Sequence, residues 1–207
     1  MARAAAALAA VIRDELGVLD VPVRQATVLL LVGSGNNGGD ALFAGAELAA
    51  SGCRVLVAEL GSRVHEAGRA AALAAGAQLV ELGDDPESSV LAAAMDAQVI
   101  VDGILGTGAY RSPALRGTAR AVVLAIRALA ASPRRRVVAV DLPSGVNPDS
   151  GEVPDGAVLP ADVTVTFGAY KAGLLRDPAS AYTGRLVLVD LGLGPELENE
   201  APLIVIE

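Results

Sequence analysis

The stretch "LLLVGSGNNGGDAL", residues 29–42, joins a run of apolar residues directly to a glycine-rich turn. Residues 33–38 fit the pattern G-x-G-x-x-G, and Glu59 follows at about the distance where a dinucleotide fingerprint places its acidic residue. Gly39 and Asp40 depart from that fingerprint, because a carboxylate there would lie unfavourably close to a pyrophosphate. No Lys-Ser or Lys-Thr pair follows the glycines, which excludes a P-loop. The stretch therefore predicts a buried strand, a ligand-binding turn and a helix, and leaves the ligand open.

Outward from this stretch, short apolar runs alternate with helical patterns along the whole chain. Strands are predicted at residues 27–32, 54–60, 78–81, 98–102, 136–141, 162–167 and 186–190, with a last short one at 203–206. Helices are predicted at residues 3–16, 40–50, 65–75, 88–95 and 118–131. The early strands are almost wholly apolar, as strands covered on both faces are. The pattern predicts an α/β fold: a Rossmann-like three-layer sandwich with a mostly parallel central sheet flanked by helices, in the strand order 3-2-1-4-5.

Composition narrows the class of protein. The 207 residues are 53% hydrophobic with a formal net charge of −8, and we expect them to form one domain, residues 1–207. An acidic surface disfavours nucleic acids and anionic membranes as partners. The single cysteine, Cys53, fits a reducing compartment. Leu8, Ile12 and Leu16 recur at a spacing of four, which predicts an amphipathic helix rather than a signal peptide. We therefore expect a cytoplasmic protein without a membrane segment.

Polar residues gather where the predicted strands end. Asp102 and Asp141 each follow an apolar strand, where a carboxylate needs partners. Arg111 and Lys171 lie in loops after the fourth and sixth strands and are suited to binding phosphates. Ligands of parallel sheets bind at the carboxyl ends of the strands, so we expect a site at this edge, although each residue alone is equally consistent with a structural role. The only histidine, His65, lies on another connection, and a structural role is its better interpretation.

Four segments, taken together, resemble one known family. They are "VGSGNNGGDAL" (32–42), "VDGILGTGAYR" (101–111), "VVAVDLPSGVNPDSGEV" (137–153) and "ADVTVTFGAYKAGLL" (161–175). In this order and at these separations they resemble the NAD(P)H-hydrate epimerases, the family that forms the N-terminal half of bifunctional NAD(P)H-hydrate repair enzymes; the resemblance covers about residues 4–194. It implies an isomerase that interconverts the R and S forms of NADH or NADPH hydrated at C6 of the nicotinamide ring. The dinucleotide would then be the substrate, with no redox cofactor.

The resemblance also implies the site residues. The substrate-binding residues would be Asn36, Asn37, Gly38, Gly39, Asp40, Gly106, Thr107, Gly108, Ala109, Tyr110, Arg111, Ser112, Asp141 and Lys171. One potassium ion per subunit would be held by Asn37, Asp102 and Ser144, helped by backbone carbonyls; all are oxygen donors, which suit a hard cation. For acid–base catalysis, we expect Asp141 to be the first candidate and Asp40 the second.

Two alternatives and several partners remain open. The first alternative to an epimerase is a ligand- or protein-binding module of the same fold without turnover. The second, less favoured, is an NAD(P)-dependent oxidoreductase. The expected partners are the hydrates of NADH and NADPH and an ADP- or ATP-dependent dehydratase, fused or separate, and a homodimer is a further expectation. The resemblance also leads us to expect that the family's leading N-terminal stretch and the dehydratase domain both lie outside this sequence.

Overall fold

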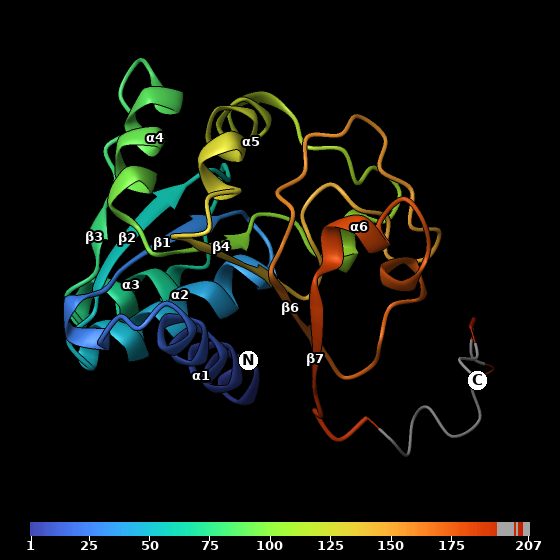
Figure 1. Ribbon diagram of the computed structural model, residues 1–207, viewed down its shortest axis with the longest axis horizontal. Helices are drawn as coiled ribbons and strands as arrows, with labels where there is room; N and C mark the ends of the chain where they lie inside the picture. Colours follow the sequence, from blue (N-terminus) through green and yellow to red (C-terminus); the bar gives the residue numbers. More distant parts are fainter. Residues whose placement is uncertain (194–200, 202, 205–207) are drawn as a thin grey trace.

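The computed structural model of the chain, described for residues 1–193, 201, 203 and 204, is built around one seven-stranded sheet (Figure 1). The strand order is β3-β2-β1-β4-β5-β6-β7, and all six pairings are parallel. The strands are β1 (Thr27–Val32), β2 (Arg54–Glu59), β3 (Gln78–Leu79), β4 (Val99–Gly103), β5 (Arg136–Val140), β6 (Val163–Phe167) and β7 (Arg185–Val189). The predicted α/β class and the order 3-2-1-4-5 are therefore confirmed, and the sheet is wholly parallel.

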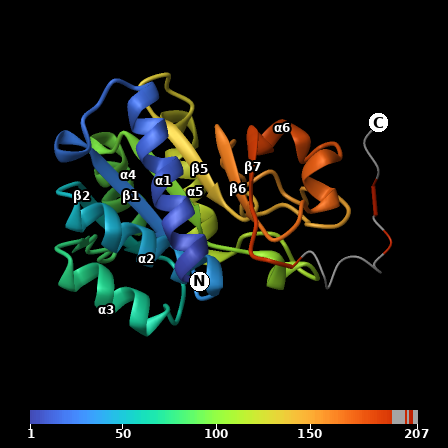
Figure 2. The same cartoon turned by 90° about the horizontal axis from the view of Figure 1, so that it is seen from below.

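Helices cover both faces of the sheet. They are α1 (Ala2–Val18), α2 (Asn36–Ala50), α3 (Glu66–Ala74), α4 (Pro86–Asp96), α5 (Gly117–Ala130) and the short α6 (Ser180–Thr183). Figure 1 shows α4 and α5 above the sheet and α1, α2 and α3 below it, and Figure 2 shows the second group from its own side. Single 3₁₀ turns, which the sequence pattern did not predict, lie at Val23–Gln25, Thr107–Ala109 and Ala172–Leu175.

The two helical layers bury opposite faces of the same strands. In β1, Leu30 and Val32 belong to the core between the sheet and helices α1 and α2. Leu29 and Leu31 belong to the core between the sheet and helices α4 and α5. Successive side chains of a strand point to opposite faces, so a strand covered on both sides needs apolar residues throughout. This explains why the run at residues 29–32 carries no polar residue. None of the helices in the described part of the chain combines the length and apolarity that crossing a membrane requires.

Two predicted elements need correction. The helix predicted to start at residue 40 starts at Asn36, because the two asparagines and two glycines form its first turn instead of a loop. Of the strand predicted at 203–206, Leu203 and Ile204 lie in irregular structure, and the other two positions fall outside the described residues. Residues 141–162, between β5 and β6, form a long loop with its own small apolar cluster, which includes Leu142, Val146 and Val158.

Candidate active site

The carboxyl ends of four adjacent strands bring the predicted site residues together. The strands β1, β4, β5 and β6 are neighbours in the sheet, so the segments that follow them share one edge. Gly33 follows β1, Ile104 follows β4, Asp141 follows β5 and Gly168 follows β6. The four segments therefore lie side by side at the edge of the sheet where the sequence predicted a site.

The first turn of α2 lies against the end of β1 and the start of α3. Gly35 is the residue before the helix, and no side chain caps this end. A Cβ atom at Gly38 would lie 2.4 Å from the carbonyl oxygen of Gly33, and one at Gly39 would lie 3.0 Å from the ring of His65. Glycine is needed at Gly38 because the backbone of the preceding turn passes too close for any side chain.

Asp141 has a backbone conformation that is unusual for its residue type. Its φ of 68° lies in the left-handed region, which costs a non-glycine residue free energy unless its surroundings hold it there. The same carboxylate oxygen, Oδ1, accepts hydrogen bonds from the hydroxyl of Thr166 at 3.3 Å and from the backbone N–H of Phe167 at 3.2 Å. Lys171 donates to it as well and forms an ion pair with it. Asp141 is thus a buried acceptor that three donors orient.

Asp40 lies near Asp141 but in a different environment. The pKa of Asp40 is raised to about 6, chiefly by burial; the negative charge of Asp141 also acts to raise it, while the N-terminal ammonium and His65 act to lower it. Its Oδ1 atom is buried and has no hydrogen-bond partner among the described residues. Two buried carboxyl groups with unequal surroundings can hold a proton on one and a negative charge on the other, as acid–base catalysis requires.

Asn37, Asp102 and Ser144 form a cluster of oxygen-bearing side chains between these elements. Ser144 donates to Asp102 twice, from its hydroxyl at 2.6 Å and its backbone N–H at 2.8 Å. The amide nitrogen of Asn37 reaches the carbonyl oxygens of Leu105, at 3.1 Å, and Val140. The residues predicted to hold a cation therefore do come together, with two backbone carbonyls beside them.

The charge of Asp102 lacks a counterpart in this cluster. Its side chain is only 1% exposed, and burial raises its pKa while hydrogen bonds from Ser144 and Ile104 oppose the shift. It makes no ion pair among the described residues. A Cβ at Gly106 would lie 2.5 Å from the side-chain oxygen of Asn37, so space beside that oxygen is kept open. A buried carboxylate of this kind fits a bound cation, since an isolated buried charge is costly.

A pocket of about 730 Å³ opens beside the start of α2. Its wall comes from the turn before α2, the loop after β2, the loop after β4 and the start of α5. Seven of the predicted substrate-binding residues line it: Asn36, Asn37, Gly106, Thr107, Gly108, Ala109 and Ser112. Asn37 connects this pocket to the carboxylates, because its side chain also reaches the carbonyl oxygen of Val140, the residue before Asp141.

The other predicted substrate-binding residues lie elsewhere at this edge, outside the wall of the pocket. Gly38 and Gly39 pack in the first turn of α2, next to Asp40. Lys171 lies on Asp141, and not among the pocket residues where a phosphate would be expected. Tyr110 is exposed, and the guanidinium of Arg111 lies 5.4 Å from the centre of its ring.

Sequence reasoning did not name Thr166 or Asn147, two residues that make contacts in this region. Thr166 lies in the predicted strand 162–167, where valine and threonine alternate, and that pattern does not distinguish it from Thr164. Asn147 donates to the carbonyl oxygen of Tyr110 at 2.9 Å, and Ser144 accepts from the N–H of Leu105 at 2.8 Å, so the long loop anchors the loop after β4 at two points. His65 accepts a hydrogen bond from the N–H of Gly68, which caps α3 and agrees with a structural role.

The acidic residue of the dinucleotide fingerprint has another partner. Glu59 forms an ion pair with Arg69 at 2.6 Å and does not line the pocket. In a dinucleotide cofactor site that carboxylate would bind a ribose hydroxyl. Residues 33–38 therefore match the dinucleotide fingerprint in sequence only. Its acidic residue, Glu59, instead makes a contact between β2 and α3.

Comparison with known proteins shows the family of this chain. Residues 1–173 match the family described as "YjeF-related protein N-terminus", and the chain belongs to this family. The fold resembles the crystal structure of yeast ynu0 (YNL200c), with a TM-score of 0.62 and 20% identity over 80% of this chain and 65% of the yeast chain.

Its relatives include several proteins with one name. The NAD(P)H-hydrate epimerase of Clavibacter michiganensis subsp. michiganensis is 51% identical over 86% of this chain and 76% of its own length. The NAD(P)H-hydrate epimerase of Microbacterium testaceum is 47% identical over 92% of this chain and 71% of its own length. The bifunctional NAD(P)H-hydrate repair enzyme Nnr of Pyrobaculum aerophilum is 41% identical over 83% of this chain, a match that covers 34% of that enzyme.

Proposed function

We propose that this chain is an NAD(P)H-hydrate epimerase, an isomerase that interconverts the R and S forms of NADH and NADPH hydrated at C6. The observation that carries the proposal is the pair of buried carboxyl groups, Asp40 and Asp141, at the sheet edge beside the pocket. Relatives up to 51% identical bear this name, and their matches cover more than two thirds of their own length.

Epimerisation at C6 requires the hydroxyl group to leave and to return on the other face. Asp40, whose pKa burial raises to about 6, is suited to donate a proton to that hydroxyl so that it leaves as water. The lone pair of the ring nitrogen stabilises the resulting cation. Asp141, oriented by Lys171 and Thr166, then takes a proton from the water that adds to the opposite face. One C6–O bond is broken and one is formed, and Asp141 gains a proton where Asp40 loses one. No oxidant or reductant is therefore needed.

We further propose one potassium ion per subunit, held by Asn37, Asp102 and Ser144. The uncompensated charge of Asp102 and the space that Gly106 leaves beside Asn37 support this assignment. A bound potassium ion would supply positive charge to this cluster. The chain's own side chains there hold together the start of α2, the loop after β4 and the turn after β5; the first of these carries Asp40 and the last carries Asp141.

Two further assignments accompany this function. We infer that the described residues form one epimerase domain, because a single sheet runs through them. We also propose that the S form passes to an ADP- or ATP-dependent dehydratase, fused or separate; the bifunctional relative of Pyrobaculum aerophilum, of which this chain matches about a third, supports such a pairing.

The direct test is an epimer assay. Purified R-NADPH hydrate is incubated with the protein in potassium buffer, and the two epimers are separated by chromatography over time. We expect an R and S mixture to form far faster than without protein, with no change in the redox state of the nicotinamide. Folded protein that leaves the rate at its spontaneous value would instead favour the binding module, and hydride transfer to a carbonyl or from an alcohol would favour the oxidoreductase.

A further inference from the structure

The pocket differs in charge from the rest of the protein. The chain has 24 acidic and 16 basic residues, yet no Asp or Glu of the described part of the chain lines this pocket. Of the described residues in its wall, Arg116 alone is charged; the other polar side chains there are neutral, from serine, threonine and asparagine. In an acidic protein, a pocket that excludes carboxylates and contains one guanidinium is suited to an anionic ligand.

Among the described residues, no carboxylate pairs with the positive charge of Arg116. Arg116 is exposed, and its one printed contact is a hydrogen bond from Nη2 to the hydroxyl of Ser112 at 2.7 Å. It makes no ion pair among the described residues, whereas Arg120, one turn further along α5, is bound to Asp155 at 2.7 Å. Because a guanidinium has five N–H donors in a planar fork, most of its capacity for hydrogen bonding is left for a ligand.

The contact with Ser112 fixes where this charge is presented. Ser112 lies in the loop after β4, and its hydroxyl accepts the hydrogen bond from the Arg116 guanidinium. Both side chains line the pocket, so this contact keeps the guanidinium at the pocket wall. The same wall carries apolar surface from Leu60, Leu115 and Ala119. A ligand with a phosphate and a flat or apolar part would find partners for both in one cavity.

We propose that Arg116 binds a phosphate group of the hydrated dinucleotide, as a substrate-binding residue outside the four motifs. The inference rests on the proposed function for the identity of the ligand, and deepens it. Arg116 lies at the start of α5, whereas the carboxyl groups lie at the ends of other elements, so it binds the substrate without taking part in the chemistry. It should therefore lower KM and leave kcat unchanged, as an interaction made equally in the ground state and the transition state does.

The substrate has two sources of phosphate, which an experiment can separate. The diphosphate is present in the hydrates of both NADH and NADPH, whereas the 2′-phosphate is present only in the NADPH hydrate. We expect Arg116→Gln to raise KM at least tenfold. An equal rise for both substrates assigns Arg116 to the diphosphate, and a rise for the NADPH hydrate alone assigns it to the 2′-phosphate.

Arg120→Gln is the matched control, because it removes the same charge from the same helix at a residue that does not line the pocket. We expect its KM to stay within twofold of the original. If KM for both substrates is unchanged in Arg116→Gln, or rises equally in Arg120→Gln, the proposal is wrong. A parallel fall in kcat would also contradict it, since that result would place Arg116 in the chemical step.

A binding measurement separates this proposal from the proposed function. ADP-ribose carries the diphosphate without the nicotinamide, and its affinity can be measured by calorimetry in a protein with no turnover at all. Binding that Arg116→Gln weakens at least tenfold, in a protein that does not epimerise the hydrates, would retain the phosphate site and reject the epimerase. If Arg116→Gln epimerises the hydrates normally, with unchanged KM and unchanged ADP-ribose binding, the epimerase is retained and the phosphate site at Arg116 is rejected.

Discussion

At the residue scale, the two carboxyl groups have the same chemistry and opposite surroundings. Asp141 accepts from three donors, whereas one oxygen of Asp40 is buried with no partner among the described residues. An acid that must give up a proton near neutral pH needs its charged form to be disfavoured, and burial does that for Asp40. The division of labour between acid and base is therefore a consequence of where two identical side chains lie.

Replacing Asp141 by asparagine tests the proposed base. Asparagine tolerates the left-handed conformation that residue 141 adopts, so the fold should be retained. We expect kcat to fall by at least about 100-fold, the usual contribution of a general base. Asp149→Asn, a change at an exposed residue of the same loop, is the control and should leave kcat unchanged. Near-normal turnover in Asp141→Asn would remove Asp141 from the mechanism.

The raised pKa of Asp40 predicts how stability depends on pH. The folded protein holds the Asp40 proton up to a pH of about 6, whereas the unfolded chain releases it near 3.8, so the folded state binds more protons in this window. The contribution of Asp40 to the free energy of unfolding is therefore fully present below pH 3.8 and is lost as pH rises to about 6. We expect the difference in stability between Asp40→Asn and the original protein, measured by urea unfolding, to shift in favour of the variant between pH 4 and pH 7. A pH-independent difference would contradict the assignment.

At the scale of the elements, one short helical turn organises the site. Asn36 to Gly39 form the start of α2, and the side chain of Asn37 spans from the loop after β4 to the end of β5. Ser144 joins the same two loops from the other direction, by accepting from Leu105 and donating to Asp102. The carboxyl groups, the oxygen cluster and the pocket are thus held together by contacts among loops that are distant in the sequence.

This arrangement predicts that potassium stabilises the fold. A cation that binds only the folded state raises the melting temperature, by an amount that grows with the logarithm of its concentration relative to Kd. We expect the protein to melt at a higher temperature in potassium chloride than in choline chloride of equal ionic strength. Asp102→Asn should abolish that difference, because it removes the charge that the cation would balance. An equal melting temperature in the two salts would contradict the proposed site.

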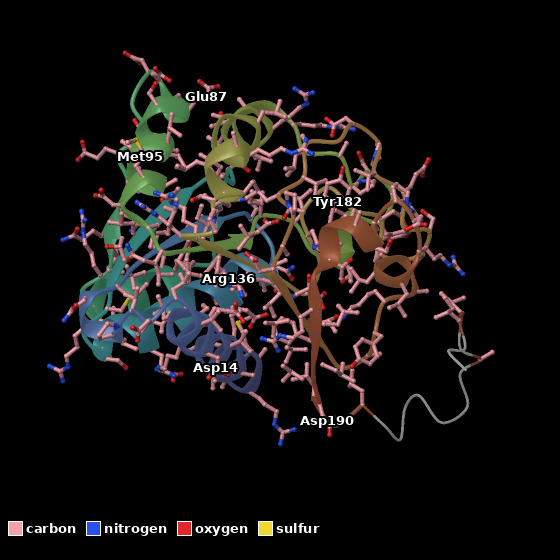
Figure 3. All side chains as sticks on the ribbon, viewed as in Figure 1. Asp14, Glu87, Met95, Arg136, Tyr182 and Asp190 are labelled. Atoms are coloured by element: carbon pink, nitrogen blue, oxygen red, sulfur yellow. The ribbon has the colours of Figure 1, made fainter. Side chains whose placement is uncertain are left out.

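At the scale of the whole molecule, a charged cluster around the buried Glu15 connects α1 to the β5–β7 half of the sheet. Glu15 is 2% exposed and contacts Arg136 of β5 at 3.0 Å and Arg185 of β7 at 2.8 Å. Arg136 also pairs with Asp162, which precedes β6. Figure 3 shows Arg136 above α1, with Asp14 on that helix below it. Helix α1 therefore connects strands that lie far from it along the chain.

Loss of this connection should weaken the protein without touching its site. We expect Glu15→Gln to lower the free energy of unfolding by about 1 kcal/mol, because it removes the buried carboxylate that pairs with Arg136 and Arg185, while Arg136 keeps Asp162 and Arg185 is exposed to solvent. Urea unfolding measures this, and kcat at a temperature where both proteins are folded should be unchanged. Asp14→Asn, at the neighbouring exposed residue, should cost less than about 0.5 kcal/mol. Equal stability of the two variants would show that the cluster contributes nothing.

The sequence by itself determined the three layers of the fold and the carboxyl edge of the sheet as the place of the candidate site. The apolar runs predicted the strands to within a few residues because a strand covered on both faces must be apolar throughout, a local requirement. The same reasoning failed at the start of α2. Asparagine and glycine are poor helix formers, and only the packing of Gly38 on Gly33 and of Gly39 on His65 makes them a helical turn.

Tertiary structure alone decided which polar residues meet and what charge each one faces. Glu59 satisfied a sequence pattern but pairs with Arg69, while Arg116 belonged to no pattern but lines the pocket. The unequal environments of Asp40 and Asp141 likewise have no counterpart in the letters of the chain. The physical reason is range: hydrophobic periodicity is set by neighbours in sequence, whereas burial and electrostatic fields are sums over residues that only the folded chain brings within a few ångströms.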